Sequence, residues 1–245
     1  MLNPPPKFIP NELINDFTLD GIIPISYECY RDDSREEIQK EINSNFNKET
    51  FEKFLVMAKN RKENYYGATD SWLYQALDKY PISDKNVCIF GSACPWYEAI
   101  AVTFGAKKCT VIEYSDRPSF HESIEYKKND DLIDGEFSVG FSISSFEHYG
   151  LGRYGDPINP IGDLEIMQKA KKIISKNGLL FLGIPIGKDF LHFNVGRIYG
   201  MTRILLLMEE WKLIESFGLF SDAFNVEINT CKHNRYQPIF VLKNI

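Results

Sequence analysis

The sequence lacks the cysteine patterns that mark a metal site or a disulfide framework. Its five cysteines, Cys29, Cys88, Cys94, Cys109 and Cys231, are odd in number, and none pairs with another Cys or His at metal-ligand spacing. The sequence therefore predicts no metal-ligating residues, and whether the protein requires a metal stays open. Scattered thiols favour a reducing compartment, which predicts a cytoplasmic protein. Cys88 and Cys109 fall in predicted strands, where a free thiol serves as a small apolar side chain.

Long runs of one residue type are also missing. Lys and Arg never follow one another for more than two or three positions, and the net charge is −6. Both features argue against a nucleic-acid or anionic-membrane partner, which a basic patch would attract. The beginning, MLNPPPKFIP, does not have the pattern of a signal peptide, and the apolar run ILLLM is far too short to span a bilayer.

What the sequence does contain is an alternation of short apolar runs with amphipathic segments. Strands are predicted at 87–90, 108–114, 123–126, 137–143, 178–185, 211–217 and 238–243, and helices at 95–105 and 162–175. This alternation predicts an α/β fold with a mostly parallel sheet covered on both faces. No clear helix separates the last two strands, so we expect a hairpin that makes the final strand of seven antiparallel.

The first quarter of the chain has a different pattern. Residues 1–30 are Pro-rich and irregular, which predicts an arm laid over the surface, and residues 34–61 have helical spacing. A further helix is predicted from Thr69 or Asp70, either of which could serve as its N-cap. We therefore expect an N-terminal arm and helical cap over residues 1–64 and one α/β domain over residues 65–245.

A cofactor site is expected beyond the carboxyl ends of the strands, where the strand order of a parallel sheet reverses. After the first strand, GSACPW provides a glycine for a tight turn and a helix start with unpaired N–H groups. After the second strand, Glu113 stands where an acid commonly accepts hydrogen bonds from ribose hydroxyls; the alternative is a solvated acid at a strand end. Trp96 could line the site or pack in the core. The predicted cofactor residues are Gly91, Ser92, Ala93, Trp96, Glu113 and Ser145.

The glycine loop narrows the choice of cofactor. In the G-x-G-x-x-G pattern of dinucleotide-binding folds, this chain has Gly91, Ala93 and Trp96, so two of three glycines are missing. A diphosphate needs the close backbone approach that those glycines allow, which disfavours a nicotinamide-dependent enzyme. S-adenosylmethionine has no phosphate, and its methyltransferase fold ends in an antiparallel strand, so it is the favoured cofactor.

Two polar loops follow the fourth and fifth predicted strands and would face one cleft. In SSFEHYGLGRYGDP, His148 could remove a proton from a hydroxyl; its rivals are Asp156 on the same loop and Asp189 and His192 on the next one. Arginine and tyrosine side chains on these loops could bind an anionic, hydroxyl-bearing acceptor. The alternative is that the same side chains only order the loops. The predicted substrate-binding residues are Arg153, Tyr154, Asp189, Asn194, Arg197 and Tyr199.

Several segments together resemble the DUF268 family of methyltransferase-like proteins. They are YGATDSWLYQAL, GSACPWYEAIAVTFGAKKCTVIEY, SSFEHYGLGRYGDPINPIGDLE, GLLFLGIPIGKD and FNVGRIYG, and they cover roughly residues 65 to 215. The region from SSFEH to IISKNGLLFLGIP also looks like the corresponding part of class I S-adenosylmethionine-dependent methyltransferases. The resemblance implies a Rossmann-like methyltransferase fold, although Gly91, Ala93 and Pro95 depart from the usual G-x-G-x-G.

These observations lead to a functional hypothesis. We expect methyl transfer from S-adenosylmethionine to an oxygen of a small, polar, anionic acceptor, such as a sugar, a nucleotide-linked sugar or a phosphoryl-bearing group in surface polysaccharide synthesis. The competing hypothesis is a non-catalytic binding domain that has kept the methyltransferase fold. Whether the chain forms a homo-oligomer stays open.

Overall fold

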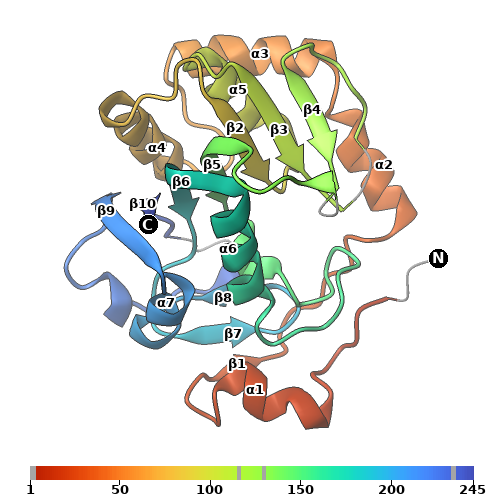
Figure 1. Ribbon diagram of the computed structural model, residues 1–245. Helices are drawn as coiled ribbons and strands as arrows, with labels where there is room; N and C mark the ends of the chain where they lie inside the picture. The colour runs from red at the N-terminus through yellow and green to blue at the C-terminus, as the bar shows by residue number, and fades with distance from the viewer. Residues whose placement is uncertain (1–3, 115–116, 129–130, 233–235) are drawn as a thin grey trace.

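A seven-stranded sheet lies between helices in the computed structural model, which describes residues 4–114, 117–128, 131–232 and 236–245 (Figure 1). The strand order is β4-β3-β2-β5-β6-β10-β9. The strands are β2 (Asn86–Phe90), β3 (Lys108–Ile112), β4 (Ile124–Lys127), β5 (Phe137–Ile143), β6 (Ile174–Gly183), β9 (Trp211–Phe217) and β10 (Ile239–Asn244). The chain runs outward from β2 to β4 and then returns to β5 on the other side of β2, so the order reverses between β2 and β5.

Strand direction follows the sequence prediction. Strands β2 to β6 pair in parallel, whereas β10 is antiparallel to both β6 and β9. All seven predicted strands occur, and two of them, Phe137–Ile143 and Trp211–Phe217, have the predicted bounds. The α/β class, the parallel sheet and the antiparallel final strand are therefore confirmed.

Alternate residues of the central strands pack against different helix layers, because side chains on a strand point to opposite faces. Val87 and Ile89 face a core shared with α3, α4 and α5, whereas Cys88 and Phe90 face a core shared with α6 and α7. The helices are α1 (Ile14–Thr18), α2 (Glu36–Ser44), α3 (Lys48–Lys59), α4 (Ala68–Lys79), α5 (Trp96–Thr103), α6 (Gly162–Ile173) and α7 (Met201–Leu207). Single 3-10 turns are η1 (Asn11–Leu13), η3 (Phe146–His148), η4 (Ala223–Asn225) and η5 (Thr230–Lys232).

The start of α4 differs from its prediction. Gly67 is the N-cap residue, with φ 55°, and Thr69 and Asp70 lie in the first turn, so the predicted cap was wrong. Asp70 is instead fully buried, where one carboxylate oxygen accepts a hydrogen bond from the backbone N–H of Asn64 (2.8 Å) and the other from the Tyr97 hydroxyl (3.0 Å). Its partners explain the displacement, because the carboxylate links α4 to the preceding loop and to α5.

The N-terminal segment forms part of a second, three-stranded sheet below the main one (Figure 1). Its strand β1 (Ile25–Ser26) pairs in parallel with β7 (Phe190–His192), which forms a hairpin with β8 (Gly196–Ile198). Phe17 and Ile23 from the arm pack with Leu191 and Phe193 from the hairpin in a separate small core. The sequence predicted an irregular arm and a polar loop here, and it missed the sheet that joins them.

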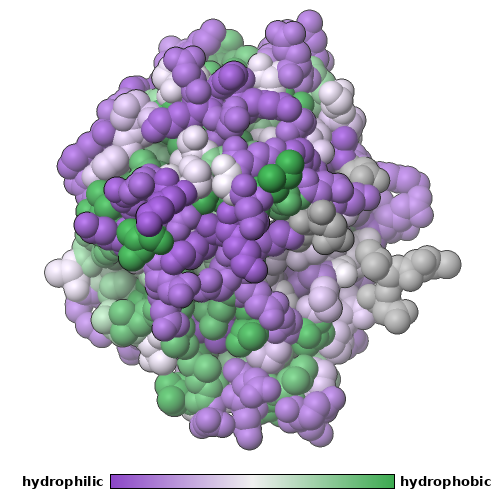
Figure 2. Space-filling view, viewed as in Figure 1, coloured by the Kyte–Doolittle hydropathy of each residue, from purple (hydrophilic) through white to green (hydrophobic). Residues whose placement is uncertain are grey.

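The surface is mainly hydrophilic in the view of Figure 2, with hydrophobic residues gathered in its lower half, where α7 and the arm lie. Met201 and Leu205 on α7 are among the exposed hydrophobic side chains. Within the described part of the chain, every helix falls short of the combined length and hydrophobicity that a bilayer-crossing segment needs.

Candidate functional site

The loop after β2 meets the end of β3 at the switch point of the sheet. The Gly91 N–H donates a hydrogen bond to the Ile112 carbonyl oxygen (3.1 Å), and the Ser92 N–H donates one to the Glu113 carboxylate. Gly91 has φ 73°, and a Cβ atom there would lie 2.6 Å from the Ser145 hydroxyl oxygen. Only glycine fits this position. The contacts also bring four predicted cofactor residues together at the ends of β2, β3 and β5: Gly91, Ser92, Glu113 and Ser145.

Glu113 is largely buried at this meeting point, with its side chain 12% exposed. Burial raises the pKa of its carboxyl group, and the nearby Arg117 guanidinium opposes that rise. Arg117 lies 3.6 Å from the second carboxylate oxygen, and it donates hydrogen bonds to Gln39 and Asn43 of α2. The sequence reasoning missed Arg117; its signal was a cation four residues after a strand-end acid.

A second carboxylate lies beneath the loop. The Ser92 hydroxyl donates a hydrogen bond to the carboxylate of Glu98 (2.6 Å), which is fully buried at the start of α5. Burial raises the pKa of Glu98 to about 7. Glu98 was also missed, although an acid within the apolar sequence WYEAIAV is a visible signal.

The two remaining predicted cofactor residues have different surroundings. Ala93 is exposed on the loop. Trp96 is 1% exposed and packs against Phe54, with ring centroids 5.4 Å apart. Trp96 therefore belongs to the core, which was the alternative interpretation of this residue.

Tyr114 provides an aromatic surface that the sequence reasoning missed. It directly follows Glu113, is 42% exposed, and its ring centroid lies 5.7 Å from that of Tyr149. An exposed ring beside Glu113, the candidate ribose acceptor, would offer a planar base a surface on which to stack. The signal was the tyrosine that follows the acid in VIEYS.

His148 lies in η3, directly after β5. Its Nδ1 is 2.7 Å from the Val195 carbonyl oxygen. A carbonyl can only accept, so Nδ1 carries the proton and the lone pair of the neutral ring is on Nε2. That nitrogen lies 3.6 Å from the buried Glu147 carboxylate, which accepts a hydrogen bond from the Ser144 hydroxyl (2.7 Å). The pair can therefore take up a proton on Nε2 and stabilise the resulting imidazolium.

Asp156 holds the same loop together. One of its oxygens accepts hydrogen bonds from the backbone N–H groups of Gly150 (2.7 Å) and Gly152 (3.1 Å), and the other accepts one from Tyr154 (3.3 Å). A carboxylate that accepts hydrogen bonds from three backbone N–H groups orders the loop around it, which is a structural role. This placement favours loop ordering, one of the two alternatives for Asp156, over proton transfer.

Arg153 is bound to the N-terminal arm. Its Nε lies 2.6 Å from a carboxylate oxygen of Asp33, and its guanidinium carbon is 4.8 Å from the centroid of the Tyr154 ring. The Tyr154 ring is also an edge-on neighbour of His148, with centroids 5.7 Å apart. Arg153 and Tyr154 therefore lie next to the candidate base, although Asp33 already partners the arginine.

Arg197 and Tyr199 are committed to an internal network. Asp163 is fully buried and contacts Arg197 at 3.6 Å, Arg203 at 2.5 Å and the Tyr199 hydroxyl at 3.1 Å. These two guanidinium groups lower the pKa of Asp163 despite its burial. Arg197 also donates to the carbonyl oxygens of Tyr149 (2.6 Å) and Pro160 (3.2 Å). The structure thus gives Arg197 and Tyr199 the loop-ordering role.

The remaining predicted residues on the loop after β6 also have partners within the protein. Asp189 accepts hydrogen bonds from the N–H groups of Gly200 (2.8 Å) and Thr202 (2.9 Å) at the start of α7. The Asn194 side chain accepts one from the Arg31 N–H (2.9 Å) and donates one to the Arg31 carbonyl oxygen. His192 lies at the end of β7 beside Cys29 and Cys231. Of the predicted bases, only His148 therefore lies on the loop after β5 with a ring nitrogen suited to accept a proton.

Strand order and site position define the class of this protein: it has the fold of class I S-adenosylmethionine-dependent methyltransferases. The solved 1,6-didemethyltoxoflavin-N1-methyltransferase of Burkholderia thailandensis, which contains 1,6-didemethyltoxoflavin and S-adenosylhomocysteine, is similar, with a TM-score of 0.51 and 10% identity over 79% of this chain and 86% of that chain. The N-methyltransferase NodS of Bradyrhizobium japonicum has a TM-score of 0.47 and 15% identity, over 72% of this chain and 94% of its own.

The family can be stated more narrowly. The model of the family described as "Caenorhabditis protein of unknown function, DUF268" matches residues 84–244. The chain therefore belongs to the DUF268 family. No curated protein matches the sequence.

Proposed function

We propose that this protein is an S-adenosylmethionine-dependent methyltransferase that methylates an oxygen of a small polar acceptor. One observation carries the proposal: Gly91, Ser92, Glu113 and Ser145 converge at the ends of three strands, where the order of a methyltransferase sheet reverses. The bound S-adenosylhomocysteine of the Burkholderia relative supports the same choice of ligand.

The residues present suit this cofactor. Glu113 would accept hydrogen bonds from the ribose hydroxyls, because its two oxygens have more acceptor positions than Ser92 and Arg117 occupy. Tyr114 would stack on the adenine, and Ser145 would bind near the donor's polar end. The cofactor supplies an electrophilic methyl group and has no diphosphate, so the missing glycines of the loop do not oppose its binding.

His148 would act as the base for a hydroxyl acceptor. His148 would take the acceptor's hydroxyl proton on Nε2 as that oxygen bonds to the methyl group and the donor's carbon–sulfur bond breaks, with S-adenosylhomocysteine as the leaving group. The Val195 carbonyl keeps the ring in the required tautomer, and Glu147 stabilises the charged imidazolium. Most of the rate enhancement would come from holding acceptor and donor in line.

The acceptor would be an anionic molecule, such as a sugar, a nucleotide-linked sugar or another phosphoryl-bearing group used in surface polysaccharide synthesis. Arg153 and Tyr154 support this choice, because an arginine and a hydroxyl adjoin the candidate base. The overall charge of −6 gives no diffuse attraction for an anion, so a local cation must hold it. Arg197 does not contribute, because its donors are used internally.

Calorimetry with S-adenosylhomocysteine tests donor binding, and a screen of candidate acceptors with methyl-labelled donor tests turnover. The proposal predicts micromolar-range donor binding and label on an oxygen of an anionic acceptor. Donor binding without transfer to any acceptor would support a non-catalytic domain with this fold. No heat with millimolar ligand would refute the proposal, and NAD in the same assay tests for a nicotinamide-dependent enzyme.

A further inference from the structure

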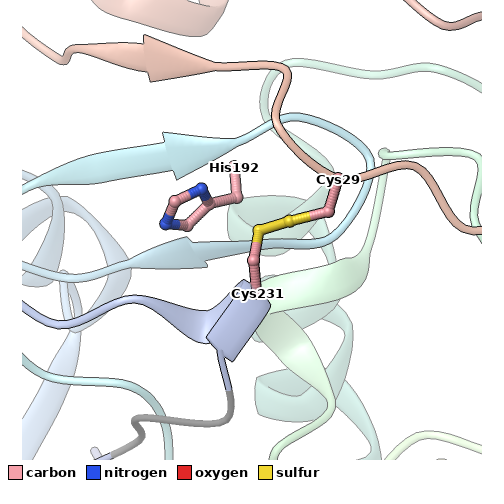
Figure 3. Close-up of side chains that lie close together, drawn as sticks. All are labelled: Cys29, His192 and Cys231. Carbon is pink, nitrogen blue, oxygen red and sulfur yellow. A yellow bond between two sulfur atoms is a disulfide. The ribbon is translucent and has the colours of Figure 1, made fainter.

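Three potential metal ligands that are far apart in the sequence lie close together in the structure. Cys29 follows β1, His192 ends β7, and Cys231 lies in η5, so the two cysteines are 202 residues apart. The structure joins the cysteines in a disulfide, with Cα atoms 6.1 Å apart. Their sulfur atoms and a ring nitrogen of His192 all lie within 4.8 Å of one another. Figure 3 shows the His192 ring beside the disulfide.

His192 is unusual for a buried polar side chain. It is 4% exposed, and neither of its ring nitrogens has a hydrogen-bond partner among the described residues. A buried polar group without a partner is rare in native proteins and calls for an explanation, such as an ion that it binds. Burial also lowers the pKa of His192.

The disulfide alone does not account for His192, because a disulfide sulfur offers at most a weak acceptor. Two thiolates would account for it. Breaking the sulfur–sulfur bond would leave two sulfur ligands next to one nitrogen ligand, and Cys29 and Cys231 are only partly buried, so both reductant and ion can reach them.

We propose that reduction of the Cys29–Cys231 disulfide creates a zinc site whose ligands are the two thiolates and the His192 imidazole. Two sulfurs and one nitrogen are a ligand set that suits Zn²⁺, and the fourth tetrahedral position would remain open to water. Tetrahedral zinc with bonds of about 2.3 Å to sulfur and about 2.0 Å to nitrogen separates its ligands by roughly 3.5–3.8 Å. The observed placement needs only small side-chain movements to reach that arrangement.

The chemistry balances with a cellular dithiol as reductant. The dithiol gives two electrons and two protons to the Cys29–Cys231 bond and is itself oxidised to a disulfide, which leaves two thiols on the protein. Zinc binding then releases both thiol protons, because the ligands are thiolates. Reduction and zinc binding would thus replace the disulfide with a zinc ion as the cross-link between the arm and the C-terminal segment.

The cluster adjoins the candidate active site. His192 and Val195 belong to the same hairpin, and the Val195 carbonyl holds the His148 ring. Past Cys29, the arm continues to Asp33, which is paired with Arg153. Either cross-link would therefore fix the arm against residues that we place near the acceptor.

Cobalt binding to the full-length protein tests the proposal directly, because thiolate-bound tetrahedral Co²⁺ has a strong visible and charge-transfer spectrum. After reduction with a phosphine and its removal, we expect one equivalent of Co²⁺ with this spectrum, displaced by Zn²⁺. The oxidised protein should bind neither ion. Mass spectrometry of blocked thiols would establish the state of Cys29 and Cys231 in each sample.

Variants identify the ligands. Cys29→Ser, Cys231→Ser and His192→Gln should each weaken Co²⁺ binding at least tenfold, whereas the matched controls Cys94→Ser and His121→Gln should leave it unchanged. Circular dichroism checks that each variant folds; for wild type, Zn²⁺ should raise the melting temperature of the reduced form only. The proposal fails if the reduced wild type binds no Co²⁺ with a thiolate spectrum. It also fails if His192→Gln binds as tightly as the wild type.

Discussion

The backbone N–H of Ser92 donates a hydrogen bond to the carboxylate of Glu113, and this bond joins the ends of β2 and β3. The two strands are parallel neighbours, so their following residues emerge side by side. Arg117 approaches the same carboxylate and links it to α2. Glu113 is therefore connected to the loop after β2 through Ser92 and to α2 through Arg117.

Removing the Glu113 carboxylate should weaken donor binding. Hydrogen bonds to a charged acceptor contribute about 1.5–3 kcal/mol, so Glu113→Ala should raise the dissociation constant of S-adenosylhomocysteine roughly ten- to a hundredfold. Calorimetry measures the change, and Glu215→Ala on β9, where the glutamate pairs with Lys79, is the matched control. An unchanged affinity in a folded Glu113→Ala protein would place the ribose elsewhere.

Replacing His148 should reduce the rate without unfolding the protein. His148→Gln keeps a donor for the Val195 carbonyl but provides no proton acceptor of comparable basicity, so the methyl-transfer rate should fall about a hundredfold or more. The melting temperature and donor affinity should stay nearly unchanged. His121→Gln serves as the control, and full activity in the His148 variant would exclude this histidine as the base.

Arg153 should affect acceptor binding and not donor binding. In Arg153→Lys the charge remains but the planar fork is lost, so the Michaelis constant for the acceptor should rise while donor affinity stays the same. Steady-state kinetics and calorimetry on one preparation measure both quantities. A fall in melting temperature with unchanged kinetic constants would instead mean that Arg153 serves only its ion pair with Asp33.

Arg197 should affect stability. Its removal leaves Asp163 with one arginine fewer in a fully buried network, and breaking such a pair costs about 3–5 kcal/mol. We therefore expect Arg197→Met to lower the free energy of unfolding by an amount of that order, as measured by urea denaturation. Lys188→Met, which removes an exposed ion pair with Glu227, should cost little. An equally stable Arg197→Met protein would contradict the structural role.

Glu98 should make the protein less stable as the pH rises. Its pKa is about 7 in the folded protein against 4.5 for the free side chain, so the folded state binds its proton more tightly. The favourable contribution of the protonated form is complete below about pH 4.5 and is lost as the pH rises through 7. The resulting total change in the free energy of unfolding is about 3 kcal/mol.

The variant Glu98→Gln should remove this dependence. Its free energy of unfolding should be close to that of the wild type near pH 5 and higher than that of the wild type near pH 8. Urea denaturation at both pH values measures this free energy. The control variant Glu122→Gln changes an exposed glutamate. Its free energy of unfolding should change between the two pH values by the same amount as in the wild type. A Glu98→Gln protein that is less stable than the wild type at pH 8 would show that the charged form is needed there.

Local sequence predicted most of the main sheet. Both faces of a central strand pack against helices, so the strand is a short apolar run in the sequence, and turn residues mark its ends. The loop after β2 and Glu113 were predictable for the same reason, since chain position fixes which residues follow each strand. Cys88 and Cys109 were also predicted correctly as buried and free.

The partners of the polar side chains were decided only by the tertiary structure. Sequence could place Arg197 and Asp163 on separate elements, but their pairing depends on how α6 and the β7–β8 hairpin pack. The disulfide between Cys29 and Cys231 was not predicted, and it departs from the thiols expected of a reducing compartment. Spacing rules for metal ligands detect neighbours in sequence, whereas Cys29, His192 and Cys231 meet only because β1 pairs with β7 and η5 packs beside them.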